Sequence, residues 1–438
     1  MAHPKDRTGG VSRRRLLQGA AGGALGVGAL GALAGCQNTT TPIGAGEGGG
    51  LSPLVEAKPT GPGGLPLPRP DNSVTWAITD DNQPIPDGRA NESRTLQIYN
   101  YADYLDPIVL KRFQKRYGVK LRVATYNSAD EAIAKLAAGA VNFDVIVGLS
   151  GSNIVNLIGQ QVLQPLNHAY LPNLERNVWP ELQDPVYDRG SRYTVPYVAW
   201  ADGIGWRNDK IREEIATMDV PWDIFWESRP YRGKVAVLDD KRDALSMPMQ
   251  RDALHAGTRP DVNTEDGAII AKAGRDLAQL TDICNVKVAI TDYQTLPEGK
   301  TWLHHSWSGD LLGAAFYYMP KGVKPDVLSF WGPQRNGVVQ NDFFCIGRTA
   351  KSPALAHRFV DFMLDEKNAY DNFVNFTGYT PPQNAIDADA LIRQGLIPKS
   401  LTDAVVRPDA FQFNQQLLQV SVTGERLWDQ AWSKFKAG

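Results

Sequence analysis

Apolar residues between positions 95 and 147 alternate between two spacings, one typical of strands and one typical of helices. In chain order they predict a strand at 96–99, a helix at 107–117, a strand at 119–123, a helix at 128–138 and a strand at 143–147. Gly118 ends the first helix, and Ser128 with Glu131 has the spacing of a capping box at the start of the second. This order predicts a doubly wound α/β sheet, in which ligands bind beyond the carboxyl ends of the strands.

The same pattern returns further along the chain, without a sequence repeat of fixed period. Further strands are predicted at 193–197, 204–206, 234–238 and 343–346. The chain has 438 residues, and a single hydrophobic core stops growing at about 250–300 residues. We therefore expect two α/β lobes after the N-terminal segment.

The N-terminal segment predicts export. Arginines at 13–15 precede an Ala-, Gly- and Leu-rich run that ends in Leu-Ala-Gly-Cys at 33–36. This arrangement is typical of a secretory signal at residues 1–35, and the consecutive arginines indicate the twin-arginine route. The ending is similar to a bacterial lipobox, so Cys36 is predicted to become the acylated N-terminus, tethered by lipid outside the cytoplasm. The alternative is an uncleaved transmembrane anchor, which would also place the chain outside.

Two irregular segments follow the signal. Residues 36–64 are rich in Thr, Gly and Pro and cannot bury enough apolar surface to order themselves, so they predict a flexible tether. Residues 65–94 contain many prolines and predict an extended arm over the first lobe. Besides Cys36, the mature chain keeps Cys284 and Cys345, which are compatible with one disulfide or with two small buried hydrophobic residues.

The charge of the mature chain narrows the choice of ligand. The whole sequence has 46 basic and 48 acidic residues, of which residues 1–35 contain five and one. Without them, 41 basic and 47 acidic residues remain, a net charge of −6. This balance argues against a nucleic-acid partner and is compatible with a cationic ligand.

Acidic and aromatic side chains follow several of the predicted strands. Tyr101, Asp103 and Tyr104 come directly after the first strand, where ring faces and a carboxylate attract the same cation, at about 0.5–2 kcal/mol per ring. Helix capping by Asp103 is the alternative. Asp240 and Asp243 end another strand and would share one face of a helix that begins there. Capping and compensation of the helix dipole are the alternative for this pair.

Three further acid-and-aromatic positions and one serine loop are weaker candidates. Trp307 and Asp310 lie in a Gly-containing loop, and Asp342 stands just before a strand, where an Asp is often only a turn residue. Ser150 follows a strand in the run Gly-Leu-Ser-Gly-Ser, whose hydroxyl and N–H groups could line a ligand.

Signatures of catalysis and metal binding are missing. The loop around Ser150 lacks the last Gly of G-x-S-x-G and the lysine and spacing of a P-loop. His304 and His305 are the best metal candidates, but neighbours on a strand point to opposite faces. We expect no enzyme activity, no metal ion and no cofactor.

Taken together, these stretches resemble the polyamine-binding proteins of bacterial spermidine/putrescine ABC importers, from about residue 95 to the C-terminus. The motifs that carry the resemblance are Tyr-Asn-Tyr-Ala-Asp-Tyr at 99–104, Asp-Val-Ile-Val at 144–147, Val-Pro-Tyr at 195–197, Gly-Ile-Gly at 203–205, Leu-Asp-Asp-Lys-Arg-Asp at 238–243, Trp-Ser-Gly-Asp at 307–310, Asp342 and Gly-Tyr-Thr-Pro at 378–381. The resemblance implies an α/β fold of the type II periplasmic-binding-protein class, with two doubly wound lobes joined by a hinge of crossing strands. The lobes would comprise residues 95–200 with 308–385, and 201–307 with 386–438.

The resemblance also implies a function and a site. In that family, aromatic rings clamp the methylene chain of a polyamine, acids take its amines, and an ABC permease receives it. It implies a monomeric binding protein. Carried over by position, the ligand-binding residues would be Tyr101, Asp103, Tyr104, Ser150, Asp240, Asp243, Trp307, Asp310, Asp342 and Tyr379, with Gln419 a weaker candidate.

Three departures from the family pattern affect the ligand rather than the fold. Tyr101 stands where the family usually has Trp, Ala102 where it has Ser or Thr, and Gly-Leu-Ser-Gly at 148–151 where its loop has Ser and Tyr. The amine could therefore differ from spermidine or putrescine. A receptor for another organic cation or a small peptide is the alternative among binding proteins, and an exported hydrolase or a structural adhesion lipoprotein are the alternatives from other classes.

Overall fold

The computed structural model describes residues 60–139 and 142–437, so the predicted signal, Cys36 and most of the predicted tether lie outside the described residues. The strands are β1 (Thr95–Tyr101), β2 (Lys120–Tyr126), β3 (Val145–Ser150), β4 (Leu163–Gln164), β5 (Val195–Arg207), β6 (Val235–Val237), β7 (Lys287–Val288), β8 (Leu303–Trp307), β9 (Leu328–Trp331) and β10 (Val339–Gly347). The α-helices are α2 (Pro107–Tyr117), α3 (Ala129–Ala137), α4 (Ile154–Gly159), α5 (Pro172–Asn177), α6 (Pro180–Gln183), α7 (Lys241–Ala256), α8 (Gly267–Cys284), α9 (Asp292–Thr295), α10 (Ser308–Gly313), α11 (Pro353–Met363), α12 (Glu366–Asn372), α13 (Ala388–Arg393), α14 (Ala410–Phe413) and α15 (Val422–Ala437).

The first sheet has the order β2-β1-β3-β10 and contains the elements predicted for residues 95–147. β1 is parallel to β2 and β3, whereas β10 is antiparallel to β3 and to the first part of β5. Asp106 caps α2 by accepting a hydrogen bond from the N–H of Ile108 at 2.8 Å, and Ser128 caps α3 by accepting one from the N–H of Glu131 at 3.2 Å. The alternating α/β pattern is therefore confirmed.

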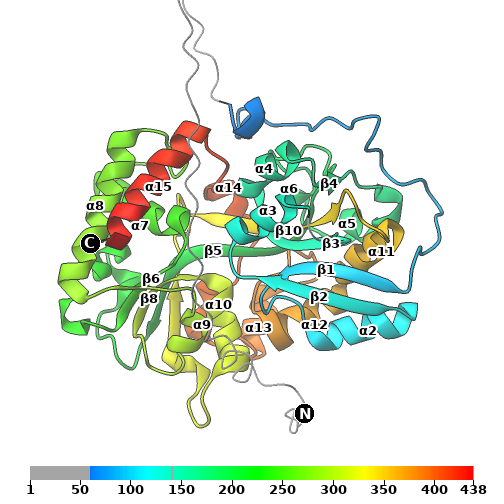
Figure 1. Cartoon of the computed structure of the whole chain (residues 1–438). Coiled ribbons are helices and arrows are strands. Elements are labelled where there is room, and N and C mark those ends of the chain that lie inside the picture. Colours follow the sequence, from blue (N-terminus) through cyan, green and yellow to red (C-terminus); the bar gives the residue numbers. More distant parts are fainter. Residues whose placement is uncertain (1–59, 140–141, 438) are drawn as a thin grey trace, which may run out of the picture. The chain divides into compact units, whose positions relative to one another are not determined.

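β5 connects this sheet to a second one because it is 13 residues long. Its first part pairs with β10, and its second part pairs with β8 and β9, so that β5 runs between the two halves in Figure 1. β6 is parallel to both β7 and β8, which gives the second sheet the order β5-β8-β6-β7. Apolar side chains of α7, α8 and α15 pack together with this sheet in one core.

Residues 308–331 belong with the second sheet. The sequence predicts them in the first lobe, but β9 pairs with β5 at Ile204–Arg207, and Leu311 shares an apolar cluster with Phe330. The physical reason is that the chain turns from β8 directly into α10, whose apolar side chains are buried on the sheet that β8 belongs to. These contacts favour a boundary closer to β10, and the lobe boundary at 308 stays a prediction.

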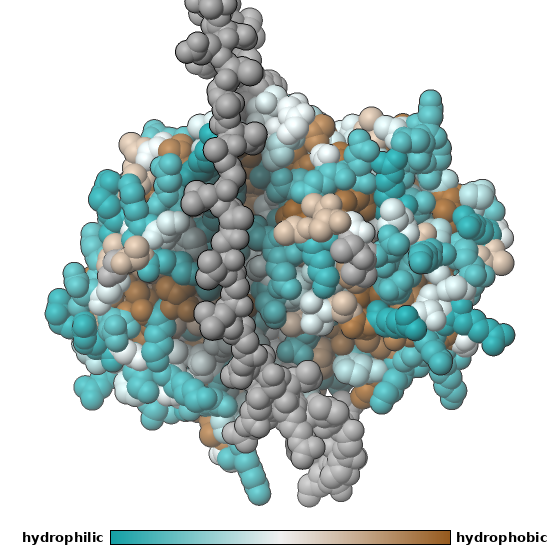
Figure 2. All heavy atoms as spheres, in the orientation of Figure 1, coloured by the Kyte–Doolittle hydropathy of each residue, from teal (hydrophilic) through white to brown (hydrophobic). Residues whose placement is uncertain are grey.

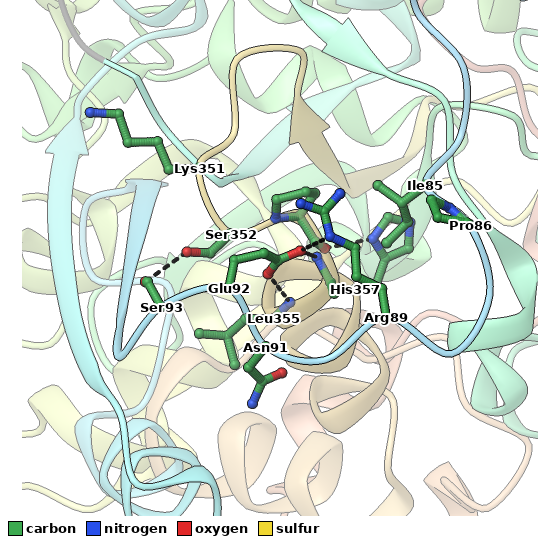
Figure 3. A network of polar contacts seen from close by, with 12 residues as sticks. Ile85, Pro86, Arg89, Asn91, Glu92, Ser93, Lys351, Ser352, Leu355 and His357 are labelled. Carbon is green, nitrogen blue, oxygen red and sulfur yellow. Dashed lines mark hydrogen bonds and ion pairs between the residues drawn. The ribbon is translucent and has the colours of Figure 1, made fainter.

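Residues 65–94 lie as an arm over the first half of the fold. The indole N–H of Trp76 donates to the backbone carbonyl of Tyr187 at 2.7 Å. Near its end, the carboxylate of Glu92 accepts the backbone N–H of Ala354 at 2.9 Å, in the first turn of α11 (Figure 3). The arm thus supplies a cap for α11, because the side chain of its N-cap residue, Ser352, makes no capping hydrogen bond.

The last residues of the predicted tether are part of the folded region. Residues 62–64 form a short helical turn, and the backbone N–H of Gly61 donates to the carbonyl of Leu65 at 2.7 Å. A Cβ at Gly61 would lie 3.0 Å from side-chain atoms of Leu67 and Val155, so the backbone packs closely there.

The two cysteines of the folded region are buried and unpaired. Cys284 ends α8 in the core of the second sheet, and Cys345 lies in β10 in a core of the first. Of the two possibilities that the sequence leaves open, the structure has two small buried side chains and no disulfide.

One face of the described region is mainly polar. On the face drawn in Figure 2, hydrophilic residues predominate and hydrophobic residues form small, separate areas. Within residues 60–139 and 142–437, no helix combines the length and the apolar character that crossing a membrane requires.

Candidate functional site

The predicted site residues gather at the carboxyl ends of strands in both sheets. Tyr101 ends β1 and Ser150 ends β3, which are parallel neighbours in the first sheet. Asp240 follows β6 and Trp307 ends β8, which are parallel neighbours in the second. Parallel α/β sheets bind ligands at this edge, because the loops that follow adjacent strands meet there.

The turn after β1 holds the rings of Tyr101 and Tyr104. The ring centroid of Tyr101 lies 5.8 Å from that of Tyr104 and 5.2 Å from that of Tyr126. The hydroxyl of Tyr101 donates to the backbone carbonyl of Asn127 at 2.8 Å, which fixes its ring. Asp103 has a left-handed backbone with φ of 62° and is exposed, so it occupies the outer position of this turn.

A glycine inside β3 allows these rings to approach closely. Gly148 has φ of 94°, and a Cβ there would lie 3.1 Å from atoms of Tyr101, Tyr104 and Tyr126. Ser150, two residues later, is partly exposed, and its hydroxyl hydrogen-bonds to that of Ser152 at 2.9 Å. The departure from the family pattern at residues 148–151, where glycine occupies position 148, therefore leaves room for the three tyrosine rings.

Asp342 accepts two side-chain hydrogen bonds in the first half of the site. The hydroxyl of Tyr104 donates to Oδ2 at 2.6 Å, and the indole N–H of Trp200 donates to Oδ1 at 3.2 Å. Burial raises the pKa of Asp342 to about 6, although both donors favour the ionised form. In the β3–β10 register Asp342 is opposite Ser150, which places these two predicted residues together.

Asp310 and Tyr379 are held together by two interlocking loops. The hydroxyl of Tyr379 donates to Oδ1 of Asp310 at 3.0 Å, and its ring centroid lies 5.0 Å from that of Tyr104. A Cβ at Gly309 would lie 2.4 Å from Cγ of Tyr379, so the ring fits only because residue 309 is glycine. The Trp-Ser-Gly-Asp and Gly-Tyr-Thr-Pro motifs thus form one structural unit.

Asp240 and Asp243 lie at the start of α7, as their spacing predicts. Asp240 is the N-cap, and its Oδ1 accepts the backbone N–H groups of Arg242 at 2.8 Å and of Asp243 at 3.2 Å. Oδ2 of Asp243 accepts the indole N–H of Trp307 at 3.3 Å. Burial is the main cause that raises the pKa of both acids. Capping and a place in the site are therefore compatible for Asp240.

Tyr101 shows which carboxylates lie near one another. Burial raises the pKa of its hydroxyl, and the negative charges of Asp310, Asp240 and Asp342 raise it further. A charge has such an effect only over a short distance. Asp342 comes from β10, whereas Asp240 and Asp310 follow strands of the second sheet. The charges of three predicted acids from both sheets therefore act on one tyrosine hydroxyl. Two of these acids, Asp342 and Asp310, also accept hydrogen bonds from Tyr104 and Tyr379, whose rings lie next to one another.

The sequence reasoning missed one acid of this site. Asp202 in β5 is fully buried, and its charge raises the pKa of both Asp240 and Asp243. Its signal is an acidic residue inside the otherwise apolar run 195–206. The sequence predicts strands at 193–197 and 204–206 on either side of Asp202, and a period-2 pattern does not show which element packs across from a strand.

The remaining candidates have other contacts. Gln419 is buried, and its side-chain oxygen accepts a hydrogen bond from the amide of Asn156 at 3.2 Å. His304 and His305 lie in β8 and are fully buried. In the described part of the chain, no group of three or more His, Cys, Asp or Glu side chains is arranged to hold a metal ion.

Comparisons with known proteins agree with this geometry. A family model described as "Bacterial extracellular solute-binding protein" matches residues 109–396. A putrescine/cadaverine-binding protein of Pseudomonas aeruginosa is 27% identical over 328 residues, which cover 73% of this chain and 89% of the relative. A spermidine/putrescine-binding periplasmic protein of Escherichia coli is 26% identical over 355 residues, which cover 80% and 93%.

Solved structures share the fold. A spermidine/putrescine ABC transporter substrate-binding protein from Streptococcus pneumoniae superposes with a TM-score of 0.62 at 22% identity, over 79% of this chain and 99% of that one. A lipoprotein of Treponema pallidum gives a TM-score of 0.61 at 20% identity, over 78% and 99%. The fold is that of type II periplasmic binding proteins, as the sequence predicts. Because the family model covers more than half of its length, the chain belongs to the bacterial extracellular solute-binding proteins.

Proposed function

We propose that this protein is an extracytoplasmic lipoprotein that captures a polyamine of the putrescine/spermidine class in a cleft between its two lobes and delivers it to an ABC permease. The observation that carries the proposal is that acids at the strand ends of both sheets bond to aromatic side chains, Asp342 to Tyr104, Asp310 to Tyr379 and Asp243 to Trp307. The names of the relatives, which include putrescine, cadaverine and spermidine, support the same ligand class.

Charge matching is the first physical argument. Among the described residues, no Lys or Arg forms an ion pair with Asp240, Asp243 or Asp342. A diamine loses the hydration of two ammonium groups when it enters a closed site, and carboxylates compensate for that loss. The acids therefore require a cation that the protein itself does not provide.

The two basic residues nearest in sequence to these acids point to other partners. The guanidinium of Arg242 donates to the backbone carbonyls of Leu418 at 3.1 Å and Val262 at 3.0 Å. The ammonium of Lys241 forms ion pairs with Glu425 and with Asp429. Neither neutralises the site, which supports an external amine as its counter-ion.

Aromatic rings supply the second argument. Tyr101, Tyr104, Trp307 and Tyr379 lie among the acids and pack against other aromatic rings, so they form an apolar wall suited to the methylene chain of an amine. Micromolar binding needs about −8.2 kcal/mol. Buried methylenes at about 0.8 kcal/mol each, ring–cation contacts and two amine–carboxylate contacts reach this value after ordering costs.

Acids on both lobes imply a motion. Without ligand, the charges of Asp240 and Asp342 repel one another and favour separation of the lobes. A cation removes that repulsion, so its higher affinity for the closed form drives closure about the strands that connect the sheets.

Calorimetric titration of the purified protein with putrescine, cadaverine, spermidine and spermine tests the proposal. We expect at least one of them to bind with a dissociation constant in the micromolar range or below. A sugar and an organic anion serve as negative controls. Millimolar or absent binding of all four amines, together with tight binding of either control, would overturn the polyamine assignment.

A further inference from the structure

Helix α2 and strand β2 carry an unusual excess of positive charge. Residues 107–129 contain no Asp or Glu, and their basic residues are Lys111, Arg112, Lys115, Arg116, Lys120 and Arg122. The whole sequence, by contrast, has more acidic than basic residues, 48 against 46. This segment therefore differs from the rest of the chain in both the sign and the density of its charge.

Four of these basic side chains face solvent without a partner. Lys111, Lys115, Lys120 and Arg122 are exposed, and with the described residues none of them forms an ion pair or a side-chain hydrogen bond. Lys111 and Lys115 lie one helical turn apart, so they share one side of α2. Unpaired charges of one sign that lie close together create a positive potential above the surface.

The two other basic residues of α2 are held by the protein itself. The guanidinium of Arg112 forms an ion pair with Asp371 at 2.6 Å, and Asp371 also pairs with Lys367 at 2.9 Å. The guanidinium of Arg116 lies 5.6 Å from the ring centroid of Tyr117. These contacts hold α2 in place, and Asp371 already has two cationic partners, so it does not neutralise the exposed lysines.

The exposed charges lie at the edge of the first sheet that is opposite the candidate site. Lys120 begins β2 and pairs with Thr95 at the beginning of β1, whereas Tyr101 of the site ends β1. The backbone N–H of Lys120 donates to the carbonyl of Arg94 at 2.7 Å, and Arg94 is exposed as well. Figure 1 shows α2 and β2 together at the outer edge of this half of the molecule. We refer to the exposed side chains of Arg94, Lys111, Lys115, Lys120 and Arg122 as the basic face.

Exposed apolar side chains accompany the basic face. Ile108 in α2 and Val123 in β2 are among the few large hydrophobic residues that are exposed in the described part of the chain. Basic residues next to exposed apolar ones are typical of surfaces that lie on anionic membranes, because the charges attract the headgroups and the apolar groups enter the boundary with the acyl chains. A soluble anion would make use of the charges alone.

Protection of an edge strand accounts for only part of the pattern. β2 is at the end of the sheet order, and charged side chains on an edge strand prevent it from pairing with another sheet. This explanation covers Lys120 and Arg122. Lys111 and Lys115 lie on a helix, which has no free edge to protect, so they need another explanation.

We propose that the basic face binds the surface of a membrane that contains anionic phospholipids, and that this contact orients the anchored protein. The inference goes beyond amine capture and does not depend on which amine is bound. The predicted lipid on Cys36 brings the membrane within reach, since residues 36–59 span at most about 80 Å when fully extended. An acyl chain combined with a basic surface is a known two-part arrangement for membrane attachment.

The two parts have different roles. The basic face alone attracts a membrane weakly and in a salt-dependent manner, so it sets the orientation of the protein and not its location. Because the candidate site is at the other edge of the sheet, contact through the basic face leaves that site open to solvent while an amine is captured.

Sedimentation with lipid vesicles tests the proposal. The protein is the predicted mature chain, residues 36–438, with Cys36→Ser, so that neither the signal nor an acyl chain contributes. In about 25 mM salt we expect at least tenfold stronger partitioning onto phosphatidylcholine vesicles with about 30 mol% phosphatidylglycerol than onto phosphatidylcholine alone. This preference is expected to disappear at about 300 mM salt, where the charges are screened. Equal partitioning onto both vesicles at low salt would overturn the proposal.

A triple substitution tests whether the basic face is the surface that binds. Each basic residue near an anionic membrane contributes about fivefold to partitioning, so Lys111→Gln with Lys115→Gln and Lys120→Gln is expected to weaken it at least tenfold. Circular dichroism and the urea midpoint check that the variant is folded. If the triple variant does not fold, Lys111→Gln alone replaces it and is expected to weaken partitioning by about fivefold. Unchanged partitioning of the folded variant contradicts the proposal.

A matched triple variant on the other half controls for net charge. Lys287, Lys321 and Lys324 are exposed and form no ion pair with a described residue, and their replacement by Gln removes the same charge. Partitioning of this control is expected to stay within about twofold of the wild type. An equal loss in both triple variants would show that net charge alone matters and would overturn the proposal.

Two further results separate this inference from its alternatives. Binding of poly-glutamate without any preference for phosphatidylglycerol vesicles would indicate an acidic protein partner and overturn the membrane assignment. Both triple variants are expected to keep the amine affinity of the wild type, measured by calorimetry without vesicles. Failure of amine binding would therefore contradict the proposed function and leave the vesicle result standing, whereas failure of vesicle binding would contradict this inference alone.

Discussion

The substitution Asp342→Asn tests two properties of this buried acid separately: how much its ionisation lowers the free energy of unfolding, and how much its charge contributes to amine binding. Asp342 is 6% exposed, and its pKa is raised from 3.8 to about 6. The difference of about two pKa units corresponds to about 3 kcal/mol at 1.36 kcal/mol per unit. This is about the amount by which ionisation of the buried Asp342 lowers the free energy of unfolding of the ligand-free protein.

The sign of the effect follows from the raised pKa. Between about pH 4 and pH 6 the native protein holds a proton that the unfolded chain has lost. The free energy of unfolding of the wild type therefore falls as pH rises through this interval, and asparagine removes this contribution. We expect the variant to gain up to about 3 kcal/mol relative to the wild type between pH 4 and pH 7. The amide oxygen can still accept a hydrogen bond from Tyr104, which preserves part of the local structure.

Urea unfolding followed by tryptophan fluorescence from pH 4 to pH 8 measures this difference, and calorimetry measures putrescine affinity. Loss of the charge is expected to weaken binding by about thirtyfold or more, from about 2 kcal/mol at least. Asp188→Asn is the matched control, because its carboxyl has a similar pKa of about 6 but lies outside the site. It is expected to show a pH-dependent change in stability with unchanged affinity. A stability difference for Asp342→Asn that is the same at pH 4 and pH 7, or unchanged putrescine binding, would refute the reasoning.

Four further variants test separate parts of the account. Gly309→Ala places a Cβ 2.4 Å from Cγ of Tyr379 and is expected to displace that ring and weaken amine binding at least tenfold, as measured by calorimetry; unchanged affinity would contradict the fit of the two loops. Asp240→Asn is expected to weaken amine binding by about 2–5 kcal/mol in the same assay while the protein stays folded, and unchanged affinity would remove Asp240 from the site. Glu92→Gln weakens the cap of α11 and is expected to cost about 1 kcal/mol in thermal unfolding without affecting amine affinity; an unchanged melting temperature would show that the cap is unimportant. Cys36→Ser is expected to move the protein from the membrane fraction to the soluble fraction of cells, and continued membrane retention would contradict lipid anchoring.

Local sequence signals predicted the regular elements of the first half well. The spacing of apolar residues before Gly118 and the capping box at Ser128 act within one or two helical turns, so they do not depend on the rest of the chain. The cap of α2 is Asp106, however, and not Asp103, which the sequence offered as a capping residue. Helix α2 has the predicted bounds, and α3 differs by one residue at each end. The run at 234–238 likewise becomes a strand that ends before Asp240, although it is shorter than predicted.

The lobe boundary at 308 could not be placed in this way. Residues 308–331 contain short elements with apolar side chains, and such a pattern shows that a face is buried without showing which sheet covers it. The pairing of β9 with β5 decides the question, and that pairing joins residues more than a hundred positions apart.

The residues of the candidate site also fall into those that the sequence predicted and those whose position only the tertiary structure decided. The sequence determined the residue types, their positions after strands and the resemblance to a family. These were enough to identify Tyr101 and the three acids whose charges raise the pKa of its hydroxyl, Asp240, Asp310 and Asp342. Only the tertiary structure decided that Asp103 is exposed in its turn and that Asp202 is fully buried in β5. The physical reason is that the ionisation of a carboxyl group depends on what surrounds it in space. A linear sequence fixes which groups can ionise, whereas the packing of distant elements determines which of them are buried and which stay exposed to water.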